Sequence, residues 1–360
     1  MNADLAPSTL DELVEAVRSV PRVIPVGGRT KPRLTQAAAT LISTLRLSGM
    51  VDYEPSEFTF TALAGTPVRE IARTLAERGQ YLPFDPMLSE AGATLGGTIA
   101  SGLSGPGRFR FGGLRDFILG VRFVDGAGRL LRMGGKVVKN AAGFDLPKFF
   151  VGSLGRWGIL AEVTFKVFPR PEASRTIALQ VDHLPGATQF IRQTSVNRWE
   201  LGALDVLPGG QRIALRLGGP ERALDPLAQE ILGRWTGNLL SIPDADDLWS
   251  NLNEFRWAHP EGYLLKVPLC PDQMPALFDA LQPVGDVRIH FSAGGNVAYV
   301  SLPGETSAVL MEKGIRGLGH TALTLRGRCP LALGRHTPTG VEAALRLSLD
   351  PLNRFPPMDD

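Results

Sequence analysis

Apolar residues recur with helical spacing near the start of the chain, at Leu10, Leu13, Val14 and Val17. Ser8 stands before them as an N-cap, with Asp11 at the reciprocal capping position. This pattern predicts a short helix that ends before Pro21.

Strand-like patterns dominate the rest of the first half. Short β-rich runs occupy residues 22–26, 40–45 and 57–65. Proline at the first turn and glycine at the end delimit a helix over residues 67–79. Residues 117–135 alternate on both sides of Asp-Gly-Ala-Gly, which predicts a hairpin, and residues 158–168 form a long alternating strand. The first half is therefore expected to be mixed α+β.

The second half repeats a β-α-β-β pattern, once over residues 175–219 and again over residues 262–302. Two such units predict one antiparallel sheet with helices on one face, the ferredoxin-like arrangement. Pro169 and Pro171 stop the strand before them, so a domain boundary is expected at residue 171. A final helix is expected over residues 339–349.

Composition and charge argue against some classes of partner and some kinds of segment, and they indicate no function of their own. The chain has 38 basic and 36 acidic residues, a net charge of +2, and 44% hydrophobic residues. This balance gives no general case for nucleic acid or a membrane surface as a partner. No window approaches about 18 uninterrupted apolar residues, and the acidic N-terminus lacks the apolar core of a secretory signal. Neither a spanning helix nor a signal peptide is therefore expected.

The chain has 2 cysteines, Cys270 and Cys329. They lie far apart in the sequence, so neither a disulfide framework nor an iron-sulfur or zinc set can be built within this chain. A reducing cytoplasm is the simplest location.

Glycine is concentrated in two loops. The chain holds 41 glycines, and the densest stretch, residues 92–113, contains two arginines and no acidic residue. A second donor-rich turn, Gly-Gly-Arg-Thr-Lys, occupies residues 27–31. Neither loop is a Walker sequence, and Gly-Ala-Gly at residues 126–128 lacks the third glycine of a Rossmann fingerprint and lies in the predicted hairpin.

These two loops suit a nucleotide cofactor. A pyrophosphate needs several backbone N–H groups with no side chain in the way, and a flat ring needs small residues close to its face. Any one glycine is explained more simply by a tight turn. Two donor-rich loops without a carboxylate nevertheless favour cofactor binding.

The same segments resemble, in order, a known flavoprotein family. The matching segments are residues 23–31, 63–86, 92–135, 139–171 and 347–357. As an ordered set they resemble the PCMH-type FAD-binding family, which includes vanillyl-alcohol oxidase and the D-lactate dehydrogenases. Within that family they are most similar to the E-type subunits of bacterial glycolate oxidases.

The resemblance implies an α+β fold in three parts. A two-subdomain FAD-binding domain would span residues 1–171, a cap domain residues 172–335, and a C-terminal segment, residues 336–360, would return to the FAD domain. FAD would be held non-covalently, because the first loop lacks the histidine that attaches flavin in some relatives. By the same resemblance, the FAD-binding residues would be Val26, Gly27, Gly28, Arg29, Thr30, Lys31, Thr94, Gly96, Gly97, Ala100, Ser101, Gly102, Ser104, Gly105, Gly158 and Ile159.

One departure from the family concerns metal binding. Relatives that act on D-2-hydroxy acids carry a cap motif resembling His-Ala-Gly-Asp-Gly-Asn-x-His, whose histidines help to bind a metal. The corresponding segment here, residues 291–299, has neither the histidines nor the aspartate. The chain's histidines are His183, His259, His290, His320 and His336. None has the spacing of a metal site, so no metal is expected.

Oxidation of a 2-hydroxy acid requires a base for the hydroxyl proton and a cation for the carboxylate. Arg326, Arg328 and His320, around a predicted cap strand, are weak candidates. Each also fits a surface arginine or a capping histidine. Arg108 and Arg110 fit flavin phosphates and a partner subunit equally well.

The resemblance implies an FAD-binding subunit that oxidises glycolate to glyoxylate, or relays electrons from it through FAD to an iron-sulfur partner subunit. A D-type flavoprotein subunit would be the other partner, and any membrane contact would come through the complex. Two alternatives stay open. One is a non-catalytic assembly subunit that keeps the fold, and the other is a stand-alone FAD-linked oxidase of another 2-hydroxy acid.

Overall fold

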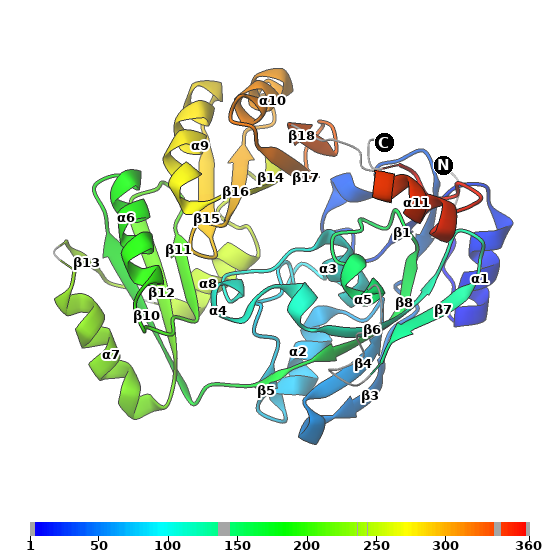
Figure 1. Ribbon diagram of the computed structural model, residues 1–360, viewed down its shortest axis with the longest axis horizontal. Coiled ribbons are helices and arrows are strands. Elements are labelled where there is room, and N and C mark those ends of the chain that lie inside the picture. The colour runs from blue at the N-terminus through cyan, green and yellow to red at the C-terminus, as the bar shows by residue number, and fades with distance from the viewer. Residues whose placement is uncertain (1–3, 136–144, 236, 243, 335–339, 358–360) are drawn as a thin grey trace. The chain divides into compact units, whose positions relative to one another are not determined.

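The computed structural model describes residues 4–135, 145–235, 237–242, 244–334 and 340–357. Contacts divide the chain into two compact units (Figure 1). The first unit comprises Met1–Ser104, Gly113–Arg170 and Thr337–Asp360, and the second comprises Gly105–Gly112 and Pro171–His336. The contact division thus falls next to the expected boundary at residue 171, whereas independent folding of the expected domains stays a prediction.

An antiparallel sheet forms the larger part of the first unit. Its strands are, in sheet order, β3 (Met50–Glu54), β4 (Thr59–Leu63), β8 (Ile159–Lys166), β6 (Ile118–Val124) and β7 (Leu130–Gly134). The predicted hairpin is confirmed as β6 and β7, with Val124 opposite Leu130. Asp125 closes its turn, because Oδ1 accepts from the N–H groups of Ala127 at 3.0 Å and Arg129 at 2.8 Å.

A smaller parallel pair, β1 (Val23–Val26) and β2 (Thr40–Ser43), completes a second layer with α1 (Leu10–Ser19). The predicted start of α1 was wrong by one residue. Thr9 is the N-cap and accepts from the Glu12 N–H at 3.1 Å, while the Glu12 carboxylate accepts from the Ser8 N–H at 2.6 Å. Glutamate has one more methylene than aspartate, which lets it reach back over the helix end.

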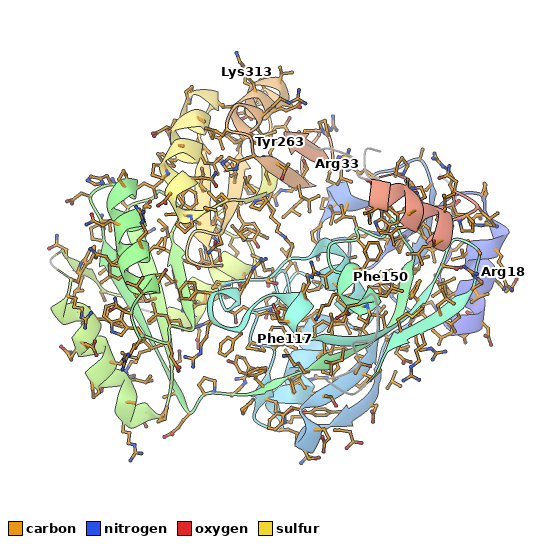
Figure 2. All side chains as sticks on the ribbon, viewed as in Figure 1. Arg18, Arg33, Phe117, Phe150, Tyr263 and Lys313 are labelled. Carbon is orange, nitrogen blue, oxygen red and sulfur yellow. The ribbon has the colours of Figure 1, made fainter. Side chains whose placement is uncertain are left out.

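The remaining elements of the first unit connect these layers. They are α2 (Val68–Ala76), β5 (Gln80–Tyr81), α3 (Leu95–Ser101), α5 (Leu146–Phe149), β9 (Phe168–Pro169) and α11 (Gly340–Leu349). Aromatic side chains fill the interior, including Phe117, 5.3 Å from the Phe84 ring, and Phe150, 4.5 Å from the Phe123 ring (Figure 2). After α11 the chain packs on α1 and β1, where Phe355 is fully buried and Arg354 Nη1 donates to the Val17 carbonyl at 2.8 Å.

The second unit contains both predicted repeats. The first repeat is β10 (Ala173–Gln180), α6 (Leu184–Ser195), β11 (Ala203–Val206) and β12 (Arg212–Gly219). The second repeat is β14 (Tyr263–Pro268), α9 (Met274–Leu281), β15 (Arg288–Ser292) and β16 (Val297–Leu302). All pairings among these strands are antiparallel, and the repeats meet where Val206 of β11 pairs with Phe291 of β15. The predicted α+β repeat architecture is therefore confirmed.

Further elements extend this sheet and cover it. They are α4 (Arg108–Phe111), α7 (Glu221–Gly233), β13 (Leu239–Leu240), α8 (Ala245–Asn253), α10 (Ala308–Gly317), β17 (Thr321–Arg326) and β18 (Ala332–Gly334). The sheet order among the described strands is β13-β10-β12-β11-β15-β16-β14-β17-β18. Helices α6, α7, α9 and α10 bury one face in a single apolar core (Figure 1). Helix α8 packs instead with Ala203 and Ala214, whose side chains lie on the other face, and this placement was not predicted.

Candidate cofactor site

The first unit contains a pocket where three loop segments meet. It encloses about 700 Å³, including the space at its open mouth. Most of the residues predicted to hold the cofactor line it. These are Val26, Gly27, Gly28, Arg29, Thr30, Lys31, Thr94, Gly96, Gly97, Ala100, Ser101 and Gly158.

The two glycine loops meet because they lack β-carbons at their contact. A β-carbon on Gly28 would overlap the carbonyl oxygen of Gly92, and one on Gly27 would overlap the hydroxyl of Thr94. The Thr94 hydroxyl also accepts from the Gly97 N–H at 3.3 Å and so caps α3. Glycine at positions 27 and 28 therefore allows the two loops to approach each other closely.

Positive charge enters the pocket from the first loop. Lys31 is only 7% exposed, and its Nζ donates to the Thr30 hydroxyl at 2.9 Å. Arg29 adopts a left-handed backbone with φ of 52° and forms an ion pair with Asp4. No aspartate or glutamate lines the pocket among the residues that the structure describes. Such a lining suits a diphosphate better than a cation or a neutral ligand.

Several lining residues were not predicted. They are Pro25, Leu34, Thr35, Thr44, Ala64, Ser153, Leu154, Gly155 and Leu160. Ser153, Leu154 and Gly155 lie in a glycine-containing turn just before Gly158. The glycines of this turn are the sequence feature from which these three lining residues could have been predicted. Ala64 comes from the end of β4, and its β-carbon would lie 2.9 Å from one added to Gly96. Only the folded sheet brings these two positions together.

Four residues predicted to bind FAD do not line this pocket in the described part of the chain. Gly102 ends α3 in the left-handed conformation with φ of 61°. The Ser104 hydroxyl accepts from the Leu114 N–H at 3.3 Å, and Ile159 is fully buried in the apolar core at the start of β8. Gly105 belongs by its contacts to the second unit. Gly102, Ser104 and Ile159 thus have roles in the fold of the first unit. Contact with FAD stays a prediction for all sixteen residues.

The arginines of residues 92–113 were the least settled feature of the sequence. Arg110 forms an ion pair with Glu200 at 2.5 Å, and both Arg108 and Arg110 belong to the second unit. Neither lines the cofactor pocket in the described residues. Among the described residues of the stretch 92–113, the pocket lining ends at Ser101.

The three candidate catalytic residues lie in or next to β17 of the second unit. Arg326 donates from Nε to the Gly262 carbonyl at 3.1 Å and from Nη2 to the His259 carbonyl at 2.5 Å. Burial lowers the pKa of His320, which is 7% exposed, and Arg328 is exposed. Arg326 is thus engaged with backbone, and a catalytic role for any of the three stays a prediction.

The segment at residues 291–299 forms the turn between β15 and β16. Within the described ranges, no group of three or more His, Cys, Asp or Glu side chains is arranged to hold a metal ion. His290 instead binds Asp205, with Nε2 2.7 Å from Oδ2. His336 lies outside the described residues.

Among the helices of the described residues, none has both the length and the apolar character needed to span a membrane.

Comparisons with known proteins find flavoprotein relatives, which agrees with a pocket suited to a diphosphate-containing cofactor. Residues 2–134 match a family model described as FAD binding domain. Glycolate oxidase subunit GlcE of Escherichia coli (strain K12) is 35% identical over 231 residues, which are 64% of this chain and 65% of that protein. Glycolate oxidase subunit GlcD of Bacillus subtilis (strain 168) is 30% identical over 145 residues, 40% of this chain and 31% of that protein. The chain thus spans less than two thirds of the length of either relative.

A solved structure of alkyldihydroxyacetonephosphate synthase shares the fold, with a TM-score of 0.72 at 18% identity, covering 97% of this chain and 74% of that one. This likeness supports the α+β architecture alone. Residues 2–134 of this chain are therefore similar to the FAD binding domain family. They supply most of the pocket lining, and the turn that follows the matched segment supplies Ser153, Leu154, Gly155, Gly158 and Leu160.

Proposed function

We propose that this chain is the FAD-binding subunit of a glycolate oxidase complex, an FAD-dependent oxidoreductase that acts on the CH–OH group of a 2-hydroxy acid. It would oxidise glycolate to glyoxylate, or relay electrons from glycolate to an iron-sulfur partner subunit. The pocket lined by Lys31 and by no carboxylate among the described residues carries this proposal, together with the similarity to GlcE.

The chain's own residues would hold FAD by charge and by close backbone approach. The Lys31 ammonium and the N–H groups of the two glycine loops would bind the diphosphate. Leu34, Leu154 and Leu160 supply an apolar wall that would exclude water from the ring. FAD, when bound, accepts the hydride that leaves the hydroxy acid. The sixteen residues predicted to contact FAD remain the proposed binding set.

The proposed partners follow from what this chain lacks. Its two cysteines are too few to hold an iron-sulfur cluster. Electron transfer to such a cluster would therefore need an iron-sulfur subunit, and similarity to GlcD supports a D-type flavoprotein as the other partner. We place the chain in the cytoplasm, reaching the inner face of the membrane only through this complex.

A non-catalytic assembly role is the second candidate. It is favoured by Arg326, whose guanidinium donates to two backbone carbonyls. In that case a companion subunit of the complex would perform the oxidation. A stand-alone oxidase would instead act on a panel of hydroxy acids without any partner.

The test starts with the purified full-length chain and its visible flavin spectrum. A yellow protein bleached by glycolate would support oxidation by this chain, and a yellow protein unmoved by glycolate would support relay or assembly. A colourless protein that binds no added FAD would refute the proposal.

Lys31→Met probes the pocket directly. A hydrogen bond from a charged group contributes about 1.5–3 kcal/mol, so the variant should bind FAD about 10- to 100-fold more weakly. Lys148→Met is the matched control, because Lys148 lies in the same unit, pairs with Asp145 on the surface and does not line the pocket. Equal FAD affinity in both variants would show that Lys31 does not contribute to FAD binding.

A further inference from the structure

The N-terminal segment of the first unit is held at the end of β2, next to the cofactor pocket. The Leu5 N–H donates to the Leu41 carbonyl at 3.0 Å, and the Leu5 carbonyl accepts from the Ser43 N–H at 2.7 Å. Leu5 thereby forms a parallel bridge opposite Ile42 of β2. Thr44, the residue after Ser43, lines the pocket. This pairing therefore fixes Leu5, and with it the residue before it, beside one wall of the pocket.

That preceding residue, Asp4, binds a cation of the pocket. Its carboxylate accepts a hydrogen bond from the guanidinium of Arg29 and forms an ion pair with it. Arg29 lines the pocket, and its backbone is left-handed with φ of 52°. A residue with a β-carbon is uncommon in this conformation and keeps it only where its surroundings hold it. The guanidinium of this lining residue is thus engaged by a carboxylate of the chain itself.

Asp4 offsets positive charge that the first loop brings to the pocket. Lys31, two residues from Arg29, also lines the pocket and is only 7% exposed. Two like charges on one short loop repel each other, and a nearby carboxylate reduces that repulsion. The ion pair of Asp4 and Arg29 is accessible to water, with side chains 36% and 52% exposed. Such exposed pairs are weak, so a stronger anion can take the place of the carboxylate.

We propose that Asp4 is an internal counterion of the cofactor pocket, and that Arg29 exchanges it for the diphosphate of FAD. The inference rests on the proposed function, which supplies the diphosphate ligand. Arginine binds phosphate oxygens through two parallel hydrogen bonds, and a diphosphate carries more charge than one carboxylate. The exchange therefore favours the cofactor. Because the ion pair has to break each time, Asp4 weakens FAD binding and so sets how tightly the pocket holds its cofactor.

Titration of FAD into the flavin-free full-length chain tests the exchange, at about 0.15 M salt. Asp4→Asn keeps the shape of the side chain and removes its charge. It should bind FAD about 2- to 5-fold more tightly, the range expected when an exposed ion pair no longer has to break. Asp4→Glu retains the charge and should bind FAD like wild type. Asp11→Asn is the matched control, because Asp11 is an exposed carboxylate in the first turn of α1, and its affinity should equal that of wild type.

A double-mutant cycle isolates the part played by Arg29. Arg29→Met should bind FAD about 10-fold more weakly than wild type, because a charged hydrogen bond to the diphosphate is lost. Adding Asp4→Asn to Arg29→Met should then improve the affinity by less than about 1.5-fold. In that background only the repulsion between Asp4 and the diphosphate remains, and salt screens it.

Two further measurements separate the exchange from a purely structural role of Asp4. Thermal unfolding of the flavin-free chain should show Asp4→Asn equal to wild type or slightly less stable, since it lacks the ion pair. A structural contact alone would make the same variant bind FAD more weakly, whereas the exchange makes it bind more tightly. ADP carries the diphosphate without the flavin ring, so the variants should bind ADP in the same order of affinity as FAD.

Unchanged or weaker FAD binding by Asp4→Asn would overturn the counterion role, and so would an equal gain with and without Arg29. Either result would leave the proposed function standing, because wild type would still bind FAD. A wild type that binds no added FAD would refute the proposed function instead. The ADP titration would then decide the counterion role by itself, since tighter ADP binding by Asp4→Asn supports it and unchanged ADP binding overturns it.

Discussion

Replacing Lys266 by methionine should stabilise the protein near neutral pH, and the gain should disappear in alkali. In the folded chain, burial and Arg108 lower the pKa of Lys266 from 10.5 to about 8. Each pKa unit corresponds to about 1.4 kcal/mol. The shift is therefore equivalent to about 3 kcal/mol, an upper value because the side chain is partly exposed and screened by water.

The sign follows from proton binding in the two states. Below about pH 8 the lysine is charged both folded and unfolded, so the folded protein carries the full cost of holding that charge. Between about pH 8 and the unfolded pKa of 10.5 the unfolded chain binds more protons, and stability of the wild type rises with pH. Above 10.5 the lysine is neutral in both states and the cost is gone.

Urea unfolding followed by tryptophan fluorescence measures this difference. The quantity of interest is the free energy of unfolding of Lys266→Met minus that of wild type, compared at about pH 7 and about pH 10. The packing of methionine contributes equally at both pH values, so only the change with pH reports the charge. Lys313→Met, a change at an exposed position of α10, should show no such change. A difference that stays constant between the two pH values, or that grows in alkali, would refute the lowered pKa of Lys266.

Two further substitutions test the glycine loops and the buried carboxylate of Asp205. Gly28→Ala should release FAD and destabilise the first unit by about 1–3 kcal/mol, since its β-carbon overlaps the Gly92 carbonyl oxygen; flavin absorbance per protein and thermal unfolding measure both effects. Gly317→Ala, where a β-carbon meets open space, is the control and should keep its flavin. Asp205→Asn should cost about 2–3 kcal/mol and Ser292→Ala about 1 kcal/mol in urea unfolding. The first change disturbs three contacts of the buried carboxylate, with His290 Nε2, the Ser292 hydroxyl and the Ala293 N–H, and the second disturbs only one of them. Equal losses in the two variants would show that the contacts of Asp205 with His290 and Ala293 do not stabilise the fold.

Much of the local structure could be predicted because it depends on neighbours in the sequence. The hairpin of β6 and β7 follows from alternation around an Asp-Gly turn, and the helix α2 from its proline and glycine boundaries. The helix start at Thr9 was missed by one residue, because serine, threonine, aspartate and glutamate all compete for the same orphan N–H groups there.

The cofactor loops could be located from the sequence, but the reason for their glycines could not. Bare backbone in two loops predicted close approach to a ligand. The structure shows that Gly27 and Gly28 also meet the other loop, at Thr94 and Gly92. Arg110 could not be assigned in advance, because Glu200, with which it forms an ion pair, lies far away in the chain.

The sequence by itself determined the elements, the two β-α-β-β repeats and the residues of the glycine loops, since periodicity and turn chemistry act over a few residues. Only the tertiary structure decided which strands are neighbours. Lys266, Tyr299, His290 and Asp205 each occupy one alternate position in a short strand, and nothing local distinguishes them from ordinary surface residues. They come to lie on one face because β11, β15, β16 and β14 pair side by side, and strand pairing is settled by packing across the whole sheet.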